Sequence, residues 1–226
     1  MKSRAAALLL TLAGLAWAAP AAAQAQAGYS LRVFGLFNEE QFLAKDTFKA
    51  IFGQATQMLW GGGISVVQDE QYYLDLSVSR FRKTGQRAFF GNGQAFPLGI
   101  PLTATLTPFE MTGGYRFHTR PKRPTRLSAR LPPPSRLVPY FGAGVGLYRY
   151  QETSAFAQAG DDVTKQHIGF IVEGGLEVRL AKWIGIAAGA NYTHVPGILG
   201  TGGVSQDAGE GDLGGISGRF RLLIGK

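Results

Sequence analysis

The sequence predicts an all-β fold, an eight-stranded antiparallel up-and-down transmembrane β-barrel. Three observations favour it: apolar residues recur with period two after residue 28, eight segments show this period, and long and short connections alternate between them. Every segment is long enough for a tilted strand to cross a bilayer. The segments are 29–37, 55–68, 71–84, 102–118, 138–151, 166–180, 183–194 and 213–225.

The first four segments differ in how regularly they alternate. In the first, the odd-numbered positions from Tyr29 to Phe37 are apolar or glycine. The second and third alternate less regularly, so their registers are less certain from sequence. In the fourth, the odd-numbered positions from Phe109 to Phe117 are apolar or aromatic apart from one glycine, and the opposite face carries Glu110. This pattern indicates strands with one apolar and one polar face.

The last four segments alternate more clearly. The fifth is rich in glycine and aromatic residues. In the sixth, the even-numbered positions of 170–180 are apolar or glycine, and the odd-numbered ones include two glutamates and an arginine. The seventh and eighth repeat the pattern over 184–192 and 216–224. A continuous apolar face therefore runs over several strands.

The connections indicate how such a barrel would lie in a membrane. Outer-membrane barrels have short periplasmic turns and long external loops. With the N-terminus on the periplasmic side, every long connection falls outside except 119–137. In chain order the connections are 38–54 (long), 69–70 (short), 85–101 (long), 119–137, 152–165 (long), 181–182 (short) and 195–212 (long).

The polar face carries four acids and five bases, which we expect to form a paired charge network inside a narrow lumen. A secreted lipocalin-like carrier also has eight strands, but it lines its interior with apolar residues. A β-sandwich is a third option that periodicity alone does not exclude. The expected network is Arg32, Asp75, Glu110, Arg116, Glu173, Glu177, Arg179, Arg219 and Arg221.

Aromatic residues near the strand ends predict a girdle at each membrane interface, as such barrels have. Aromatic residues also favour strands in general, so this is supporting evidence only. The expected girdle is Trp60, Tyr115, Phe117, Tyr148, Tyr150, Trp183 and Tyr192.

Residues 1–27 have the features of a signal peptide. Lys2 and Arg4 precede an apolar stretch of about fifteen residues, and small residues follow. We expect cleavage after Ala23 or Ala27, with residues 28–226 forming the exported barrel. The localisation predicted is the cell outer membrane.

The formal charge of +8 is concentrated in one connection. Residues 119–137 contain six bases, five prolines and no acid, so they favour an extended, polyproline-like segment on the periplasmic side. Its possible partner is cell-wall polymer or another anionic surface; the alternative is an insertion kept soluble by its charge. The remainder is nearly neutral, so nucleic-acid binding has little support, and we expect a monomer in contact with outer-membrane lipid. The bases are Arg120, Lys122, Arg123, Arg126, Arg130 and Arg136.

Two external loops have features of their own. Residues 42–52 could form a short amphipathic helix that caps the barrel or touches lipid, and a packed loop helix is the favoured interpretation. Asp207, Glu210 and Asp212 could hold Ca²⁺, but their spacing matches no known calcium loop, and a solvated acidic loop is favoured.

The sequence gives no support for an enzyme. His118, His167 and His194 are expected near strand ends, and alternation puts His167 with the lumen set and His194 with the lipid set. No motif places a nucleophile beside a base, and the chain has no Cys. We therefore predict no catalytic residue, metal or cofactor.

The chain resembles the small outer-membrane β-barrel proteins of Gram-negative bacteria, of the OmpA-transmembrane, opacity and surface-antigen type. The residues that carry the resemblance are 139–148 (PYFGAGVGLY), 174–180 (GGLEVRL) and 188–192 (AGANY). The resemblance implies a structural or surface-interaction role. The alternatives are a narrow channel for small or hydrophobic solutes and, less favoured, a lipid-modifying enzyme or a lipocalin-like carrier.

Overall fold

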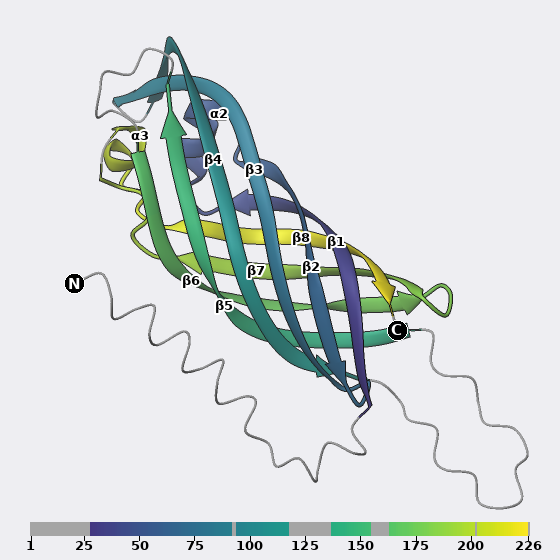
Figure 1. Cartoon of the computed structure of the whole chain (residues 1–226). Helices are drawn as coiled ribbons and strands as arrows, with labels where there is room; N and C mark the ends of the chain where they lie inside the picture. Colours follow the sequence, from purple (N-terminus) through teal and green to yellow (C-terminus); the bar gives the residue numbers. More distant parts are fainter. Residues whose placement is uncertain (1–27, 92–93, 118–136, 155–162, 202, 226) are drawn as a thin grey trace, which may run out of the picture.

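The computed structural model describes residues 28–91, 94–117, 137–154, 163–201 and 203–225, which form one closed antiparallel barrel (Figure 1). Each strand pairs with its neighbours in sequence, and β8 closes the ring against β1. The predicted fold class and strand order are confirmed. The strands are β1 (Tyr29–Phe42), β2 (Thr56–Gln68), β3 (Tyr72–Gly91), β4 (Gln94–Arg116), β5 (Leu137–Thr153), β6 (Val163–Arg179), β7 (Ile184–Val195) and β8 (Leu213–Gly225).

Several predicted segments lie outside the described residues. These are the signal peptide 1–27, with both of its cleavage sites, and the basic connection 119–137 apart from Leu137, where β5 begins. His118 lies outside them as well.

The strand registers place the connections as the sequence predicts. Tyr29 pairs with Gln68, and Arg32 pairs with Gly225, so the start of β1, the β2–β3 turn and the end of β8 share one end of the barrel. The β6–β7 turn lies at that end too, because Arg179 pairs with Gly185. We call this the turn end and the opposite one the loop end.

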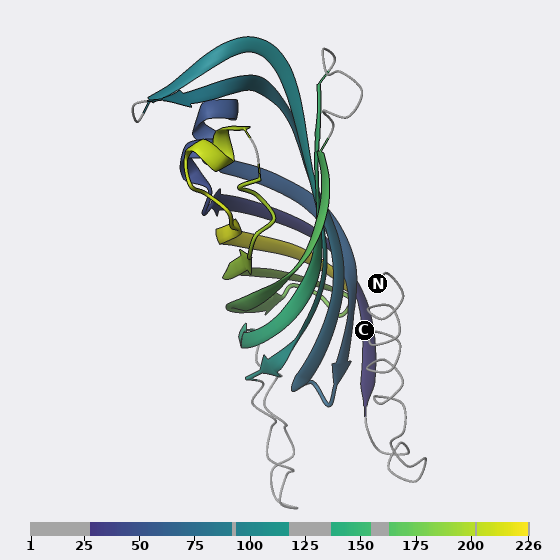
Figure 2. The same ribbon diagram turned by 90° about the vertical axis from the view of Figure 1, so that its left-hand side faces the viewer.

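The prediction of a long loop at 85–101 is wrong, because β3 and β4 continue as a hairpin arm beyond the barrel. Pairing between β2 and β3 ends at Trp60–Arg80, whereas β3 and β4 stay paired to Gly91–Gln94. Figure 2 shows this arm curving over the loop end. The prolines at 97 and 101 hid the strand from the sequence. They are tolerated because no described residue pairs with this part of β4 on its β5 side.

The two faces of the strands differ as the alternation predicts. On β5, Leu137, Phe141, Val145 and Leu147 are exposed on the outer surface, whereas Tyr140 and the other residues of opposite parity are directed inward. The same division holds on the other strands, where large apolar side chains cover the outside. No helix in the described part of the chain is long and apolar enough to cross a membrane.

The loop end is filled by an apolar plug around α2 (Lys45–Phe52) and α3 (Gly203–Asp207). Phe48 of α2 stacks on Phe42 of β1 with ring centroids 4.1 Å apart, and both contact Phe81 of β3. The amphipathic helix expected within 42–52 is therefore present, and it is the favoured packed loop helix. Its buried face packs into the loop end of the barrel.

Candidate functional site: a charge network across the lumen

The middle of the lumen is crossed by ion pairs between strands that are not neighbours. Arg219 of β8 is 3% exposed at its side chain, and its two terminal nitrogens contact Glu110 of β4 at 2.9 Å and Glu173 of β6 at 3.0 Å. Its Nε donates to Asn38 of β1 at 3.1 Å. One guanidinium therefore joins β8, β1, β4 and β6. Such charge-assisted, forked hydrogen bonds are the strongest that side chains form.

Arg221 makes a second crossing, one step closer to the turn end. Its Nη1 donates to Asp75 of β3 at 2.6 Å, and its Nη2 lies 3.7 Å from Glu173. The guanidinium also lies over the ring of Tyr140, 4.8 Å from the centroid. A cation held against an aromatic face and two carboxylates is stabilised without bulk water.

Buried tyrosines supply further donors to the network. The Tyr73 hydroxyl donates to Glu173 at 2.9 Å, and the Tyr148 hydroxyl donates to Glu110 at 2.8 Å. Room for Tyr73 comes from a glycine on another strand, because a Cβ at Gly142 would lie 2.1 Å from the Tyr73 oxygen. Small residues opposite large ones let an eight-stranded barrel fill its interior.

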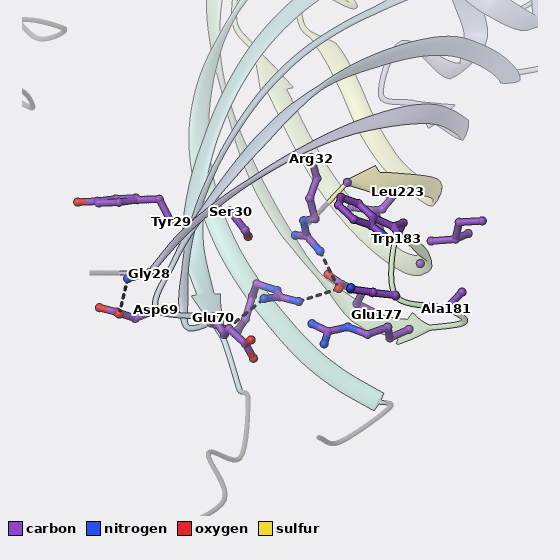
Figure 3. A pocket seen from close by; sticks show the side chains of 16 residues that line it. Gly28, Tyr29, Ser30, Arg32, Asp69, Glu70, Glu177, Ala181, Trp183 and Leu223 are labelled. Atoms are coloured by element: carbon purple, nitrogen blue, oxygen red, sulfur yellow. Dashed lines mark hydrogen bonds and ion pairs between the residues drawn. The ribbon is translucent and has the colours of Figure 1, made fainter. Parts of the chain in front are cut away.

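The turn end of the lumen opens into a cavity of about 770 Å³, which Figure 3 shows. At its base Glu177 accepts hydrogen bonds from Arg32 at 2.7 Å and from Arg116 at 2.6 Å. Arg116 also donates to the Glu70 carbonyl in the β2–β3 turn. The cavity lining is rich in cations, since Arg179 and Lys182 join these two arginines.

The structure thus brings together eight of the nine charges expected in the lumen. The ninth, Arg179, is exposed at the turn-end mouth, and no ion pair joins it to another described residue. Glu40 is an additional buried acid that lies near Glu110 and Arg219. Four arginines and five carboxylates therefore occupy the interior: Arg32, Arg116, Arg219 and Arg221 with Glu40, Asp75, Glu110, Glu173 and Glu177.

The expectation that Tyr148 and Tyr150 belong to an aromatic girdle is wrong. Both are buried, and the Tyr150 hydroxyl donates to Glu152 at 2.6 Å. The physical reason is parity: on β5 they share the inward face with Tyr140, whereas Leu147 and Val145 face out. The alternation of β5 already indicates this, because even-numbered positions of the strand face inward whether or not they lie near its end.

Four other expected girdle residues lie on the outer surface. Trp60 and Tyr192 are exposed toward the loop end, and Phe117 toward the turn end. The expectation is wrong for Trp183, which lines the turn-end cavity and shares the odd-numbered, inward parity of β7. Tyr115 is half-buried and packs edge-on against Tyr72 and Phe117. The sequence analysis missed Tyr72 as part of this turn-end row.

Sequence analysis also missed the uncharged residues of the lumen. Asn38, Tyr73 and Tyr140 all contact the network. Asn38 and Tyr73 each lie an even number of residues from a charged lumen residue on the same strand, and Tyr140 lies at one of the buried, even-numbered positions of β5. For Tyr73 the signal was its spacing of two from Asp75. That signal was weak because β3 alternates irregularly.

Two of the acidic loop residues accept hydrogen bonds from backbone amides, and they do so at different places. Glu210 accepts from the backbone amides of Asp46 at 3.0 Å and Thr47 at 2.8 Å, so it caps the N-terminus of α2. Asp212 accepts instead from the Gly197 amide at 3.0 Å. Among the described residues, no group of three His, Cys, Asp or Glu could hold a metal ion.

The two described histidines lie on different faces, as expected. His167 contacts the Pro196 carbonyl, and His194 lies 3.8 Å from Asp212 at the loop-end rim and against Phe170. Neither lies beside a hydroxyl nucleophile in the contacts of the described residues.

Comparison with known proteins finds similar folds at low identity. The N-terminal β-barrel domain of Pseudomonas aeruginosa OprF is 12% identical, with 89% of this chain and 100% of that chain covered and a TM-score of 0.47. Neisserial surface protein A is 13% identical, with 88% of this chain and 97% of that chain covered and a TM-score of 0.47. Ail, the attachment invasion locus protein of Yersinia pestis, is 10% identical, with 87% of this chain and 95% of that chain covered and a TM-score of 0.46. No family model and no curated protein matches the chain.

Proposed function

We propose that this chain is an outer-membrane β-barrel protein with a structural or surface-interaction role, and that charged side chains plug its lumen. The observation that carries the proposal is the contact of Arg219 with both Glu110 and Glu173, which ties opposite walls of the barrel together. A conducting pore of eight strands would need space at this level, and side chains already fill such narrow barrels.

Placement in a membrane is supported by the outer surface of the strands. On β5 the outward positions from Leu137 to Leu147 are apolar or small over ten residue steps. That run is about 34 Å along the strand, or about 26 Å in height at a tilt of 40°. An apolar band about 25 Å tall is what the hydrocarbon core of an outer membrane requires. A lipocalin-like carrier would have the opposite arrangement of faces.

A plug of two layers supports a closed lumen. The charge network occupies the middle, and the apolar cluster around α2 occupies the loop end. An ion entering from the turn-end cavity would meet buried ion pairs and then a layer of buried apolar side chains. Both layers oppose transport of small hydrophilic solutes.

The hairpin arm is the surface that supports an interaction role. Beyond the last β4–β5 pair it carries Phe89, Phe96 and Leu98, which are each about half exposed. Phe89 and Phe96 are cross-strand partners. Exposed large apolar side chains on a projecting hairpin are typical of contact surfaces. The partner, and any partner of 119–137 such as cell-wall polymer, stay predictions.

Cell fractionation, heat modification and conductance test this proposal together. We expect the protein in the outer-membrane fraction, a gel shift on boiling, and no single-channel current in planar bilayers. A soluble periplasmic protein without a shift would refute the membrane placement. Steady conductance in the wild-type protein would refute the plugged lumen and leave the barrel fold intact.

One observation favours the second candidate, a conduit for hydrophobic solutes. Because β2 and β3 separate above Trp60–Arg80, a groove of about 440 Å³ lies between them. Met58 and Phe81 are its apolar lining residues, and the other six are polar or charged. Phe81 also belongs to the apolar plug. The test is uptake of a labelled hydrophobic compound into vesicles that contain the protein. Uptake that is lost when Met58→Cys and Arg82→Cys are joined by a disulfide would support this role over the first.

A further inference from the structure

We propose that the outer surface of β3–β5, just above the apolar band at the loop end, binds the phosphate groups of a phosphorylated glycolipid in the outer leaflet. Arg80 and Arg149 are the residues assigned to it. The proposal rests on the outer-membrane placement proposed above.

The register shows an abrupt change from apolar to hydrogen-bonding side chains. Val78 pairs with Phe109, Phe109 with Leu147, and Leu147 with Ile168, so one outward row is entirely apolar and exposed. The next outward row has no large apolar side chain between β3 and β6, although its member on β2 is Trp60. From β3 to β6 it is Arg80, Thr107, Arg149 and Gln166.

A second polar row follows in the same direction. From β3 to β6 it is Arg82, Thr105, Gln151 and Thr164. Eight adjacent outward positions on four strands therefore offer hydrogen-bond donors and no carboxylate.

The height of the first polar row matches the headgroup level. Arg149 is the first outward residue of β5 after Leu147, where the apolar run of about 26 Å ends. Trp60 pairs with Arg80 across β2 and β3 and is 64% exposed, as expected of a tryptophan at a membrane interface. Because the strands of such a barrel tilt by about 40°, Arg80 and Arg149 differ in height by about 6 Å, which is about the thickness of one headgroup layer.

Both guanidiniums are available. Arg80 and Arg149 are exposed, and no hydrogen bond or ion pair joins either of them to another described residue. Among the described residues, Glu152 accepts from Tyr150 on the inward side, and Glu39 lines the β2–β3 groove together with Arg82. Because Glu39 is near Arg82, the proposal depends on the first row rather than the second.

The spacing suits a headgroup with two phosphates. Arg80 and Arg149 are separated by one strand, which puts their Cα atoms about 10 Å apart, and Thr107 lies between them with its hydroxyl. Planar guanidiniums bind phosphate through two parallel hydrogen bonds. A diphosphorylated glycolipid could engage both arginines at once, whereas a lipid with one phosphate could engage one.

Lipid titration tests the site. The probes are diphosphoryl lipid A, monophosphoryl lipid A and phosphatidylglycerol in mixed micelles of a zwitterionic detergent, and the readout is Trp60 fluorescence in a Trp183→Phe background. We expect diphosphoryl lipid A to bind about tenfold more tightly than the other two. Arg80→Gln with Arg149→Gln should remove that preference.

The matched control removes the same charge at the other end of the barrel. Arg179→Gln with Lys182→Gln should leave the preference unchanged, because both residues lie at the turn-end mouth. A gel shift on boiling verifies that each variant forms a closed barrel, and Arg149→Gln alone serves if the double variant does not. Equal affinity for all three lipids, or an equal loss in both double variants, would overturn the site. Failure of the outer-membrane placement would show instead as mislocalisation in the fractionation experiment.

Discussion

Arg219 Nη2 lies 2.9 Å from Glu110 Oε2, and the two residues come from β8 and β4, which are opposite each other in the ring of eight strands. The pair therefore spans the lumen and connects two opposite strands of the barrel. Its partners in the same layer, Glu173 and Asn38, come from two further strands. Interactions across the ring add to the backbone ladder and resist flattening of the barrel.

Removing Arg219 should destabilise the barrel strongly. Arg219→Met would leave Glu110 and Glu173 buried with fewer counter-charges, and breaking a buried pair on one side costs about 3–5 kcal/mol. The measurement is the urea dependence of the heat-modifiable folded form in detergent. Arg149→Met, on the outer surface, should change the unfolding free energy by less than about 0.5 kcal/mol.

Neutralising the partners should recover part of this loss. In Arg219→Met, adding Glu110→Gln and Glu173→Gln removes the unpaired charges and leaves groups that Tyr148 and Tyr73 still contact. We expect the triple variant to be more stable than Arg219→Met alone. If the single variant is as stable as the wild type, the network does not stabilise the fold.

A second prediction concerns the packing of Tyr73 against Gly142. A Cβ at 142 would lie 2.1 Å from the Tyr73 oxygen and 2.8 Å from a backbone oxygen, so Gly142→Ala should cost about 1–3 kcal/mol. In a Tyr73→Phe background the cost should shrink, because the closest atom is absent. Gly35→Ala is the control, since its Cβ would meet nothing within 4 Å. Equal effects at 142 and 35 would contradict the packing.

Strand alternation was enough to predict the fold and most of the lumen charges. Charged side chains are costly in lipid, so they face the lumen, and whether a residue number is odd or even decides which face of the strand its side chain occupies. It was not enough where alternation breaks, because the arm over 85–101 contains two prolines at positions that no described residue of β5 pairs with. Placing Tyr148 and Tyr150 at the interface followed their position along the strand, but parity decides which side of the sheet a residue occupies. The uncharged network residues needed the tertiary registers.

A third prediction concerns Glu210, which caps α2 from a distant loop. Ala44 at the helix start provides no side-chain cap, and Glu210 accepts from the Asp46 and Thr47 amides and the Thr47 hydroxyl. Glu210→Ala should destabilise α2 locally by about 0.5–2 kcal/mol. Hydrogen exchange of the Thr47 and Phe48 amides should accelerate correspondingly.

The rest of the barrel should be unaffected by that change. The strand amides of β6 and β7 should keep their protection, because no contact joins Glu210 to the lumen network among the described residues. Asp207→Ala, at the end of α3, is the control and should leave α2 protected. Faster exchange throughout the barrel would show that the plug and the strands unfold as one unit.

The tryptophans provide the last prediction, which tests the membrane placement. Beyond the predicted signal peptide the chain has two tryptophans: Trp60, exposed on the outer surface at the loop end, and Trp183, which lines the turn-end cavity. In vesicles, lipids brominated near the headgroup should quench Trp60, and lipids brominated deep in the acyl chain should quench it less. Trp60→Phe and Trp183→Phe separate the two signals, and acrylamide added outside intact vesicles of uniform orientation should reach one tryptophan and not the other. A Trp60 that is quenched equally by deep and shallow bromines, or by neither, would place the apolar band elsewhere.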